Sequence, residues 1–213
     1  MDLIGQIPQT IFDYQYLTSL LGQYASPRDK ITRLLRSKEI LRVKKGLYIL
    51  GENLRRMPLV REELANLIYG PSYVSLEYAL SYYSMIPEQA TTVTSITSGR
   101  SRIFQTPVGR FTYRQIGLAA FRIGMDRVER EDGQAFLIAT REKALADKLA
   151  AEKKLAIQSQ RELIKYLETD LRMNIQDLAA LDPDQVEGIA AHYHSKKIKV
   201  LAGVVRHLRK GGN

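Results

Sequence analysis

Lysine and arginine side chains are concentrated between residues 28 and 45, where eight of them occur with only two acidic residues. Cations at this density bind the phosphates of a nucleic acid, and arginine can also pair with base edges. Apolar Ile31, Leu34 and Leu35 recur among them at helical spacing, which predicts a folded unit rather than a basic tail. The alternative is an amphipathic helix whose charges only face solvent.

Two helices are expected in this first region. The first begins after Asp13 and ends near Gly22, and the second begins after Ser26 with Pro27 at its first position, where a missing N–H does no harm. The following stretch "LRVKKGLYIL", residues 41–50, predicts a strand, a turn and a second strand. Helix, short turn, basic helix and basic-tipped hairpin is the order of a winged helix-turn-helix.

Each part of such a unit has its own role on DNA. The N-terminal half of the second helix can reach base edges in the major groove, and a basic hairpin tip can contact the backbone. We therefore expect Arg28 and Lys30 near the bases, and Lys44 and Lys45 against phosphates. The predicted DNA-binding residues are Ser26, Arg28, Lys30, Arg33, Arg42, Lys44 and Lys45.

The composition of the whole chain also favours binding to nucleic acid. A net charge of +9 on 213 residues favours a polyanionic partner, the alternative being a basic but inert surface. The absence of cysteine excludes disulfides, thiolate catalysis and cysteine-based zinc sites. The start of the chain does not resemble a signal peptide, and no stretch is apolar enough to span a bilayer. We expect a cytoplasmic protein with no membrane contact and no cofactor.

The composition changes after "GENLRRMP", residues 51–58, which is typical of a linker. We expect two domains, residues 1–57 and 58–213. The second should combine strands with helices, and should be helical from about residue 140. The expected fold class is α+β, with an N-terminal winged helix-turn-helix followed by a larger mixed α/β domain that has a mostly antiparallel sheet and a helical C-terminal part.

Arginines recur through the strand-like stretch that runs from residue 91 to residue 116. No acidic residue occurs between Glu88 and Asp126. The arginines either form a second nucleic-acid-binding face or simply point outward from a sheet, and both interpretations stay open. The predicted second basic face consists of Arg100, Arg102, Arg110 and Arg114.

The residues that could support catalysis do not form a convincing set. His192 and His194 are two apart on a predicted helix and so point to different sides, whereas a helical metal pair needs a spacing of four. Glu142, Lys143 and Asp147 resemble part of a nuclease acid–lysine set, but Glu142 and Lys143 are adjacent and no partner acid lies on a preceding strand. An ion pair along a helix accounts for them better. We predict no catalytic residues and no metal ligands.

The hairpin "RVKKGLYIL", residues 42–50, and three segments downstream of it, read together, resemble the AbiEi family of antitoxins and predicted transcriptional regulators. The first match is Ser75, Leu76, Ala79, Leu80, Ile86 and Pro87. The second is Thr106, Pro107, Gly109, Arg110, Phe111 and Tyr113. The third is Ala139, Glu142, Lys143, Ala144, Leu145 and Asp147. The chain departs from the family pattern at Tyr83, where glycine is common, and at Arg141, where proline is usual.

The resemblance implies a function that the residues alone do not. Family members are antitoxins of type IV toxin–antitoxin pairs that counteract a nucleotidyltransferase-like toxin and repress their own operon. It implies inverted repeats in the operator DNA, bound cooperatively by a monomer or weak dimer, while direct contact with the toxin stays open. The alternatives are a nucleic-acid-processing enzyme with a basic docking domain, and an adaptor that binds an acidic protein partner.

Overall fold

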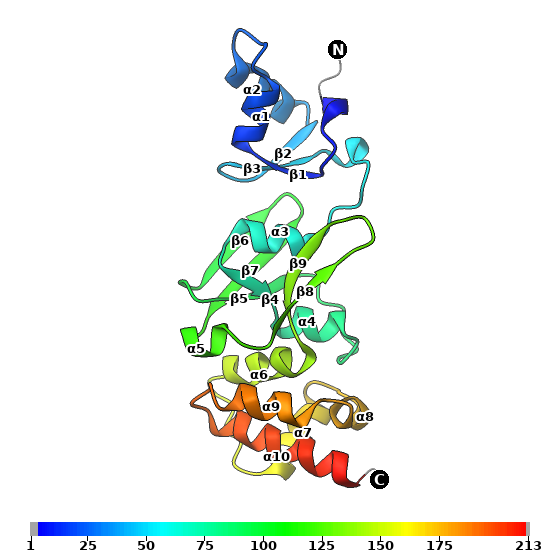
Figure 1. Ribbon diagram of the computed structural model, residues 1–213, viewed down its shortest axis with the longest axis vertical. Coiled ribbons are helices and arrows are strands. Elements are labelled where there is room, and N and C mark those ends of the chain that lie inside the picture. Colours follow the sequence, from blue (N-terminus) through cyan, green and yellow to red (C-terminus); the bar gives the residue numbers. More distant parts are fainter. Residues whose placement is uncertain (1–3, 212–213) are drawn as a thin grey trace.

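A computed structural model describes residues 4–211. The molecule is elongated, and the chain passes in sequence order through three layers stacked along its long axis (Figure 1). The α+β class expected from the sequence is confirmed, while the winged helix-turn-helix stays a prediction. No helix of the described residues has the length and apolar character needed to cross a membrane.

The N-terminal layer, residues 4–54, is a small antiparallel sheet covered by two helices. The sheet has the strand order β1-β3-β2, so that β3 is central. The elements are η1 (Ile4–Gln6), β1 (Ile11–Asp13), α1 (Tyr14–Leu20), α2 (Pro27–Arg36), β2 (Ile40–Lys44), β3 (Leu47–Leu50) and η2 (Glu52–Leu54). The Asp13 side chain accepts a hydrogen bond from the Tyr16 N–H at 2.7 Å, which confirms the predicted cap. Ser26 holds the corresponding position of α2, but its side chain makes no capping hydrogen bond.

The sheet layer, residues 61–139, holds six strands in the order β6-β7-β5-β4-β9-β8. Three of the five strand pairs are antiparallel, and β5–β7 and β4–β9 are parallel, so the sheet is mixed. The elements are α3 (Arg61–Ile68), β4 (Ser72–Val74), α4 (Leu76–Tyr82), β5 (Val93–Thr97), β6 (Arg102–Thr106), β7 (Gly109–Gln115), α5 (Leu118–Phe121), β8 (Met125–Glu129) and β9 (Ala135–Ala139).

The helical layer, residues 141–211, begins where the sequence predicts it. The Thr140 side chain accepts a hydrogen bond from the Lys143 N–H at 3.2 Å and so starts the first helix. The helices are α6 (Arg141–Ala151), α7 (Gln160–Thr169), α8 (Ile175–Ala179), α9 (Pro183–Ala190) and α10 (Lys196–Gly211). Helix α6 lies between the large sheet and the other helices of this layer (Figure 1).

The small sheet is buried on both faces. Tyr48 packs toward α1 and α2, in a core that also holds Leu34. Val43 and Ile49, on the opposite face, belong to the larger core that continues through the sheet layer into the helical layer. The domain boundary predicted at residue 57 stays a prediction, and the structure adds that a cut there would expose this second apolar face to water.

Candidate nucleic-acid interface

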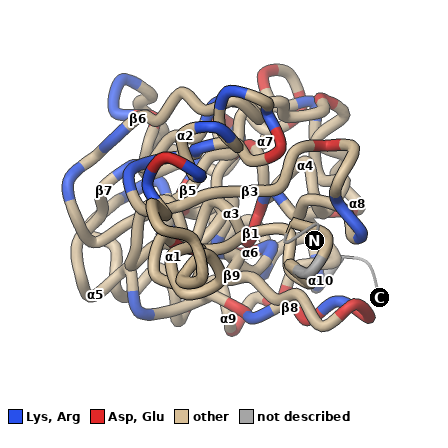
Figure 2. Tube along the Cα trace, turned by 90° about the horizontal axis from the view of Figure 1, so that it is seen from above, with Lys and Arg blue, Asp and Glu red and all other residues tan. Residues whose placement is uncertain are grey.

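Helix α2 presents a cationic face at the outer end of the molecule. Ile31 and Leu34 are buried beneath it, whereas Arg28, Arg33 and Arg36 are exposed. Viewed from this end, Lys and Arg positions gather around α2 (Figure 2). The 3.6-residue period places the apolar side chains inward and the charges outward, as the sequence predicts.

The charges of this face are mostly uncommitted. Neither Arg28 nor Arg33 forms a salt bridge within residues 4–211. Lys30 is half-buried, and its ammonium lies 5.6 Å from the centre of the Tyr24 ring, so part of its charge is directed at a neighbour. Asp29 is the one acidic residue of α2 and lies in its first turn, where its negative charge interacts favourably with the helix dipole.

A close backbone approach fixes α2 relative to the small sheet. After α2 ends, Lys38 adopts a φ of 59°, and Gly51 N–H donates to the Glu39 carbonyl at 2.7 Å. A Cβ atom at Gly51 would lie 2.3 Å from the Lys38 carbonyl oxygen, closer than any real contact. Glycine at this position therefore lets the corner between α2 and β2 close against the end of β3.

Arg42 shares the side of the sheet that carries the helices. It lies opposite Tyr48 in the β2–β3 register, and directly opposite residues point to the same face. Since Tyr48 packs into the core under α1 and α2, Arg42 faces the same way, and its side chain is exposed. Arg42 can therefore act together with the α2 cations.

The predicted strand, turn and strand are present as β2, a short turn and β3. Lys44 pairs with Leu47, so the turn holds only Lys45 and Gly46, with Gly46 at a φ of 85°. The Tyr14 N–H donates to the Gly46 carbonyl at 3.0 Å, which ties the tip to the start of α1. The turn is therefore held against the start of α1.

Lys44 is engaged between two layers instead of facing outward. Its ammonium donates to the carbonyl oxygen of Ile68, the last residue of α3, at 2.6 Å. Partial burial there lowers the pKa of Lys44 below its usual value. A cation at the C-terminus of a helix satisfies a free carbonyl and the helix dipole. Of the two tip lysines, only Lys45 is exposed, so we leave Lys44 out of the interface.

The four arginines of the predicted second basic face do not share one face. Arg102 is paired with Tyr113, whose hydroxyl donates to the Ala65 carbonyl of α3 at 2.6 Å, so Arg102 lies on the α3 side of the sheet. Arg110 and Arg114 alternate with the inward residues of β7 and lie on the opposite side. Arg100 is exposed in the loop before β6.

Two of these arginines also have partners within the protein. The Arg102 guanidinium lies 6.0 Å from the centre of the Tyr69 ring. Arg114 donates to the Ala151 carbonyl at the end of α6, at 3.2 Å. The second basic face is therefore reduced, in this structure, to Arg110 with its neighbour Arg114 on one side of the sheet and Arg100 at the rim.

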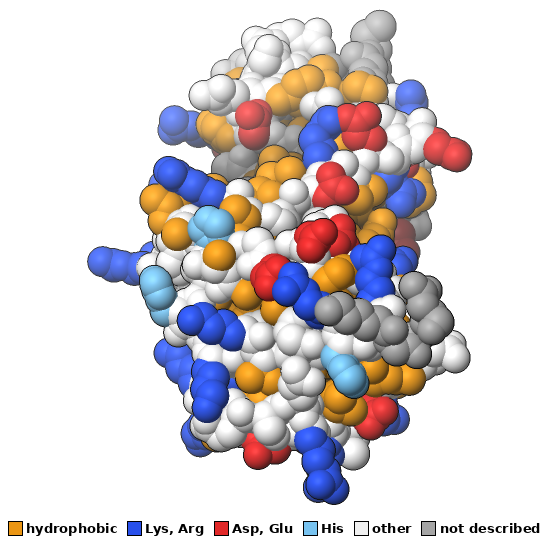
Figure 3. All heavy atoms as spheres, turned by 60° about the horizontal axis from the view of Figure 1, so that its bottom comes forward, with side chains coloured by type: hydrophobic (Ala, Val, Ile, Leu, Met, Phe, Trp, Pro, Cys, Tyr) orange, Lys and Arg blue, Asp and Glu red, His pale blue; other side chains and the backbone are white. Residues whose placement is uncertain are grey.

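The helical end of the molecule mixes charges of both signs (Figure 3). Arg206 pairs with Glu187, and Arg209 lies 3.9 Å from Asp182. His192 and His194 are exposed, and within residues 4–211 no three His, Asp or Glu side chains are placed to hold a metal ion. Ion pairs therefore compensate part of the positive charge at this end of the molecule.

The predicted ion pair between Lys143 and Asp147 is present, at 2.8 Å, but it is completely buried. Glu142 does not join it, because its carboxylate accepts the Asp182 N–H at 3.1 Å instead. Tyr73, Ser75 and Tyr193 also donate to Asp147, and no pattern in the sequence predicts the two tyrosine contacts. Tyrosine at helical or strand spacing reads as ordinary core, so only the tertiary structure brings them together.

A scan against protein-family models finds no match for this chain, and neither does a search of curated proteins. The AbiEi resemblance therefore stays a prediction carried by the quoted motifs. The exposed cationic face of α2 is an observation that does not depend on this resemblance.

Proposed function

We propose that this protein is a DNA-binding transcriptional regulator that places α2 in the major groove. The observation that supports this most is the exposed cationic face of α2, which shares a core with α1 at one end of the molecule. Arg28 and Arg33 are five residues apart, about 7.5 Å along the helix and about 140° around it, so they lie toward opposite edges of its polar face and can reach different parts of one duplex. Arg42 and Lys45 are exposed on the hairpin of the same layer and suit the phosphate backbone.

The net charge of +9 also supports this proposal, because it raises the affinity of the protein for any DNA. Phosphate contacts supply most non-specific binding and speed association with DNA. Base contacts from the start of α2 then supply sequence preference. Ser26 suits a phosphate contact, because its exposed hydroxyl is not used for capping and can donate to a phosphate oxygen.

We further propose that the regulator is the antitoxin of a type IV toxin–antitoxin pair. The support is the AbiEi-like motif set, together with the position of its residues in the sheet layer and in α6. In this proposal the cytoplasmic protein binds inverted repeats in its own operator cooperatively, as a monomer or weak dimer. The sheet and helical layers then oppose a nucleotidyltransferase-like toxin.

A reporter driven by the DNA upstream of the protein's own gene tests the regulatory part. Wild-type protein should repress it, and Arg28→Gln with Arg33→Gln should restore expression at an equal protein level. The matched control is Arg161→Gln with Lys165→Gln, which removes the same charge from exposed positions on α7. Equal repression by all three proteins would exclude α2 as the DNA-reading helix.

The antitoxin part has its own test. The protein is co-expressed with the product of the neighbouring gene, and growth is measured. Rescue of growth by the Arg28→Gln, Arg33→Gln variant, which no longer represses, would place neutralisation outside α2. Growth arrest with wild-type protein present would refute the antitoxin proposal and leave the regulatory one standing.

A further inference from the structure

Residues from two of the motif segments, far apart in the sequence, meet in one buried cluster. Asp147 of α6 accepts hydrogen bonds from Ser75 at 2.7 Å, from Tyr73 at 3.1 Å and from Lys143 at 2.8 Å. The Tyr193 hydroxyl also donates to Asp147, and the Lys143 ammonium donates to Tyr193. The Lys143 and Asp147 side chains are fully excluded from solvent.

Every charged group of this cluster has polar partners, and these partners offset the cost of burying the charges away from water. Both oxygens of Asp147 are engaged, and the Lys143 ammonium lies 4.5 Å from the centre of the Tyr193 ring and 5.6 Å from that of Tyr73. Loss of one partner from such a group is costly, because it leaves a buried charge undercompensated. The bare backbone of Gly124 lets the Lys143 stem lie against it, since a Cβ there would be 2.8 Å from the Lys143 Cβ.

The partners of Asp147 come from different layers. Tyr73 and Ser75 lie in and directly after β4 of the sheet layer, while Tyr193 lies in the turn between α9 and α10. Tyr193 is the cluster member that comes from beyond α6. Helices α9 and α10 pack on each other and on α6, and α10 also packs on α7 and α8. The polar contact of the turn between them runs from the Tyr193 hydroxyl to Asp147 of α6, and Asp147 in turn connects it to Tyr73 and Ser75 of the sheet layer.

We infer that this cluster is a latch that holds α9 and α10 on the rest of the molecule, and that these two helices open together when the Tyr193 hydroxyl is removed. Local opening of this kind involves contiguous structural units and leaves the remaining core folded. The motif residues Ser75, Lys143 and Asp147 then serve the closure of the helical layer. This role is independent of DNA binding by α2.

Hydrogen exchange of the full-length Tyr193→Phe variant, followed by mass spectrometry, tests the latch. Phenylalanine keeps the ring and its packing and removes only the hydroxyl. Loss of a hydrogen bond to a charged group should speed exchange in residues 183–211 roughly ten- to a hundredfold. Exchange in β4 and β5 should stay within a factor of about two, because opening is confined to the helical pair.

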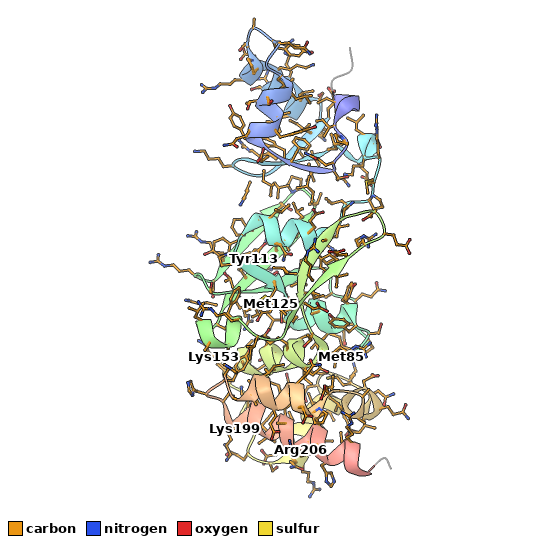
Figure 4. The ribbon with its side chains drawn as sticks, viewed as in Figure 1. Met85, Tyr113, Met125, Lys153, Lys199 and Arg206 are labelled. Carbon is orange, nitrogen blue, oxygen red and sulfur yellow. The ribbon has the colours of Figure 1, made fainter. Side chains whose placement is uncertain are left out.

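Tyr113→Phe is the matched control. Tyr113 is also buried, and its hydroxyl donates to the Ala65 carbonyl, but it lies in the sheet layer away from α9 and α10 (Figure 4). Its loss should speed exchange in α3 and leave residues 183–211 unchanged. The latch is refuted if Tyr193→Phe leaves α9 and α10 unchanged, or if it speeds exchange equally in the sheet layer.

Discussion

Lys44 and Lys45 are adjacent in the sequence, but the structure gives them different roles, and exchanging each for methionine separates these roles. The Lys44 ammonium donates to the Ile68 carbonyl at 2.6 Å, whereas Lys45 is exposed in the turn. Lys44→Met should therefore weaken the contact between the N-terminal and sheet layers. Lys45→Met should weaken only the attraction to DNA.

The two effects have different sizes and are measured differently. A hydrogen bond from a charged donor contributes about 1.5–3 kcal/mol, and since Lys44 is only partly buried, we expect its loss to lower the free energy of unfolding by about 1 kcal/mol. Lys45→Met should change the free energy of unfolding by less than about 0.5 kcal/mol. Each phosphate contact contributes about 0.9 to the slope of log K against log salt, so Lys45→Met should flatten that slope by about 0.9.

Urea unfolding and DNA binding measured by fluorescence anisotropy at several salt concentrations give both quantities for each variant. The reasoning fails if Lys44→Met flattens the salt slope as much as Lys45→Met does while stability is unchanged. That result would mean that the hairpin is free in solution and acts as the wing that the sequence predicts.

Three further outcomes are expected. Asp13→Ala should lower the free energy of unfolding by about 1 kcal/mol because it removes a used cap, whereas Ser26→Ala should change it by less than about 0.5 kcal/mol, as urea unfolding can show. Burial raises the pKa of Tyr83 from 10.0 to about 12, so its contribution to stability is complete below pH 10 and is lost as the pH rises through about 12; a spectroscopic alkaline titration should show its ionisation delayed to that range. Arg28→Ala should cost about 1–3 kcal/mol of binding to the operator and less on random DNA, and equal losses in anisotropy would make Arg28 a phosphate contact.

Local signals in the sequence predicted local structure. Asp13 before an apolar repeat marked the start of α1, and Thr140 marked the start of α6, because a cap and a helical period depend only on neighbouring residues. The order of helix, helix and hairpin in the N-terminal layer followed from the same signals. The Asp132-Gly133 pair between β8 and β9 is a local signal of the same kind, and Gly133 adopts the positive φ that such a turn needs.

Features that depend on register or on distant contacts were not predictable. The turn between β6 and β7 pairs Arg102 with Tyr113, which places Arg102 and Arg110 on opposite faces, and a shift of one residue would have reversed this. The Lys44 partner is 24 residues away and the Tyr193 partner Asp147 is 46 residues away. No periodic pattern in one chain carries such pairings. The sequence therefore predicted Lys44 against phosphate and an ion pair along a helix for Lys143, but it predicted neither the Ile68 contact nor the complete burial of the ion pair.

The salt dependence of binding to the operator tests the central proposal most directly. Wild-type protein, the Arg28→Gln, Arg33→Gln variant and the Arg161→Gln, Lys165→Gln control are compared on the same DNA. If α2 contacts DNA through both arginines, the first variant should lose about 1.8 from the slope of log K against log salt, and the control should lose nothing. Equal slopes for the two variants would show that charge alone attracts the protein to DNA, and would contradict the role assigned to α2.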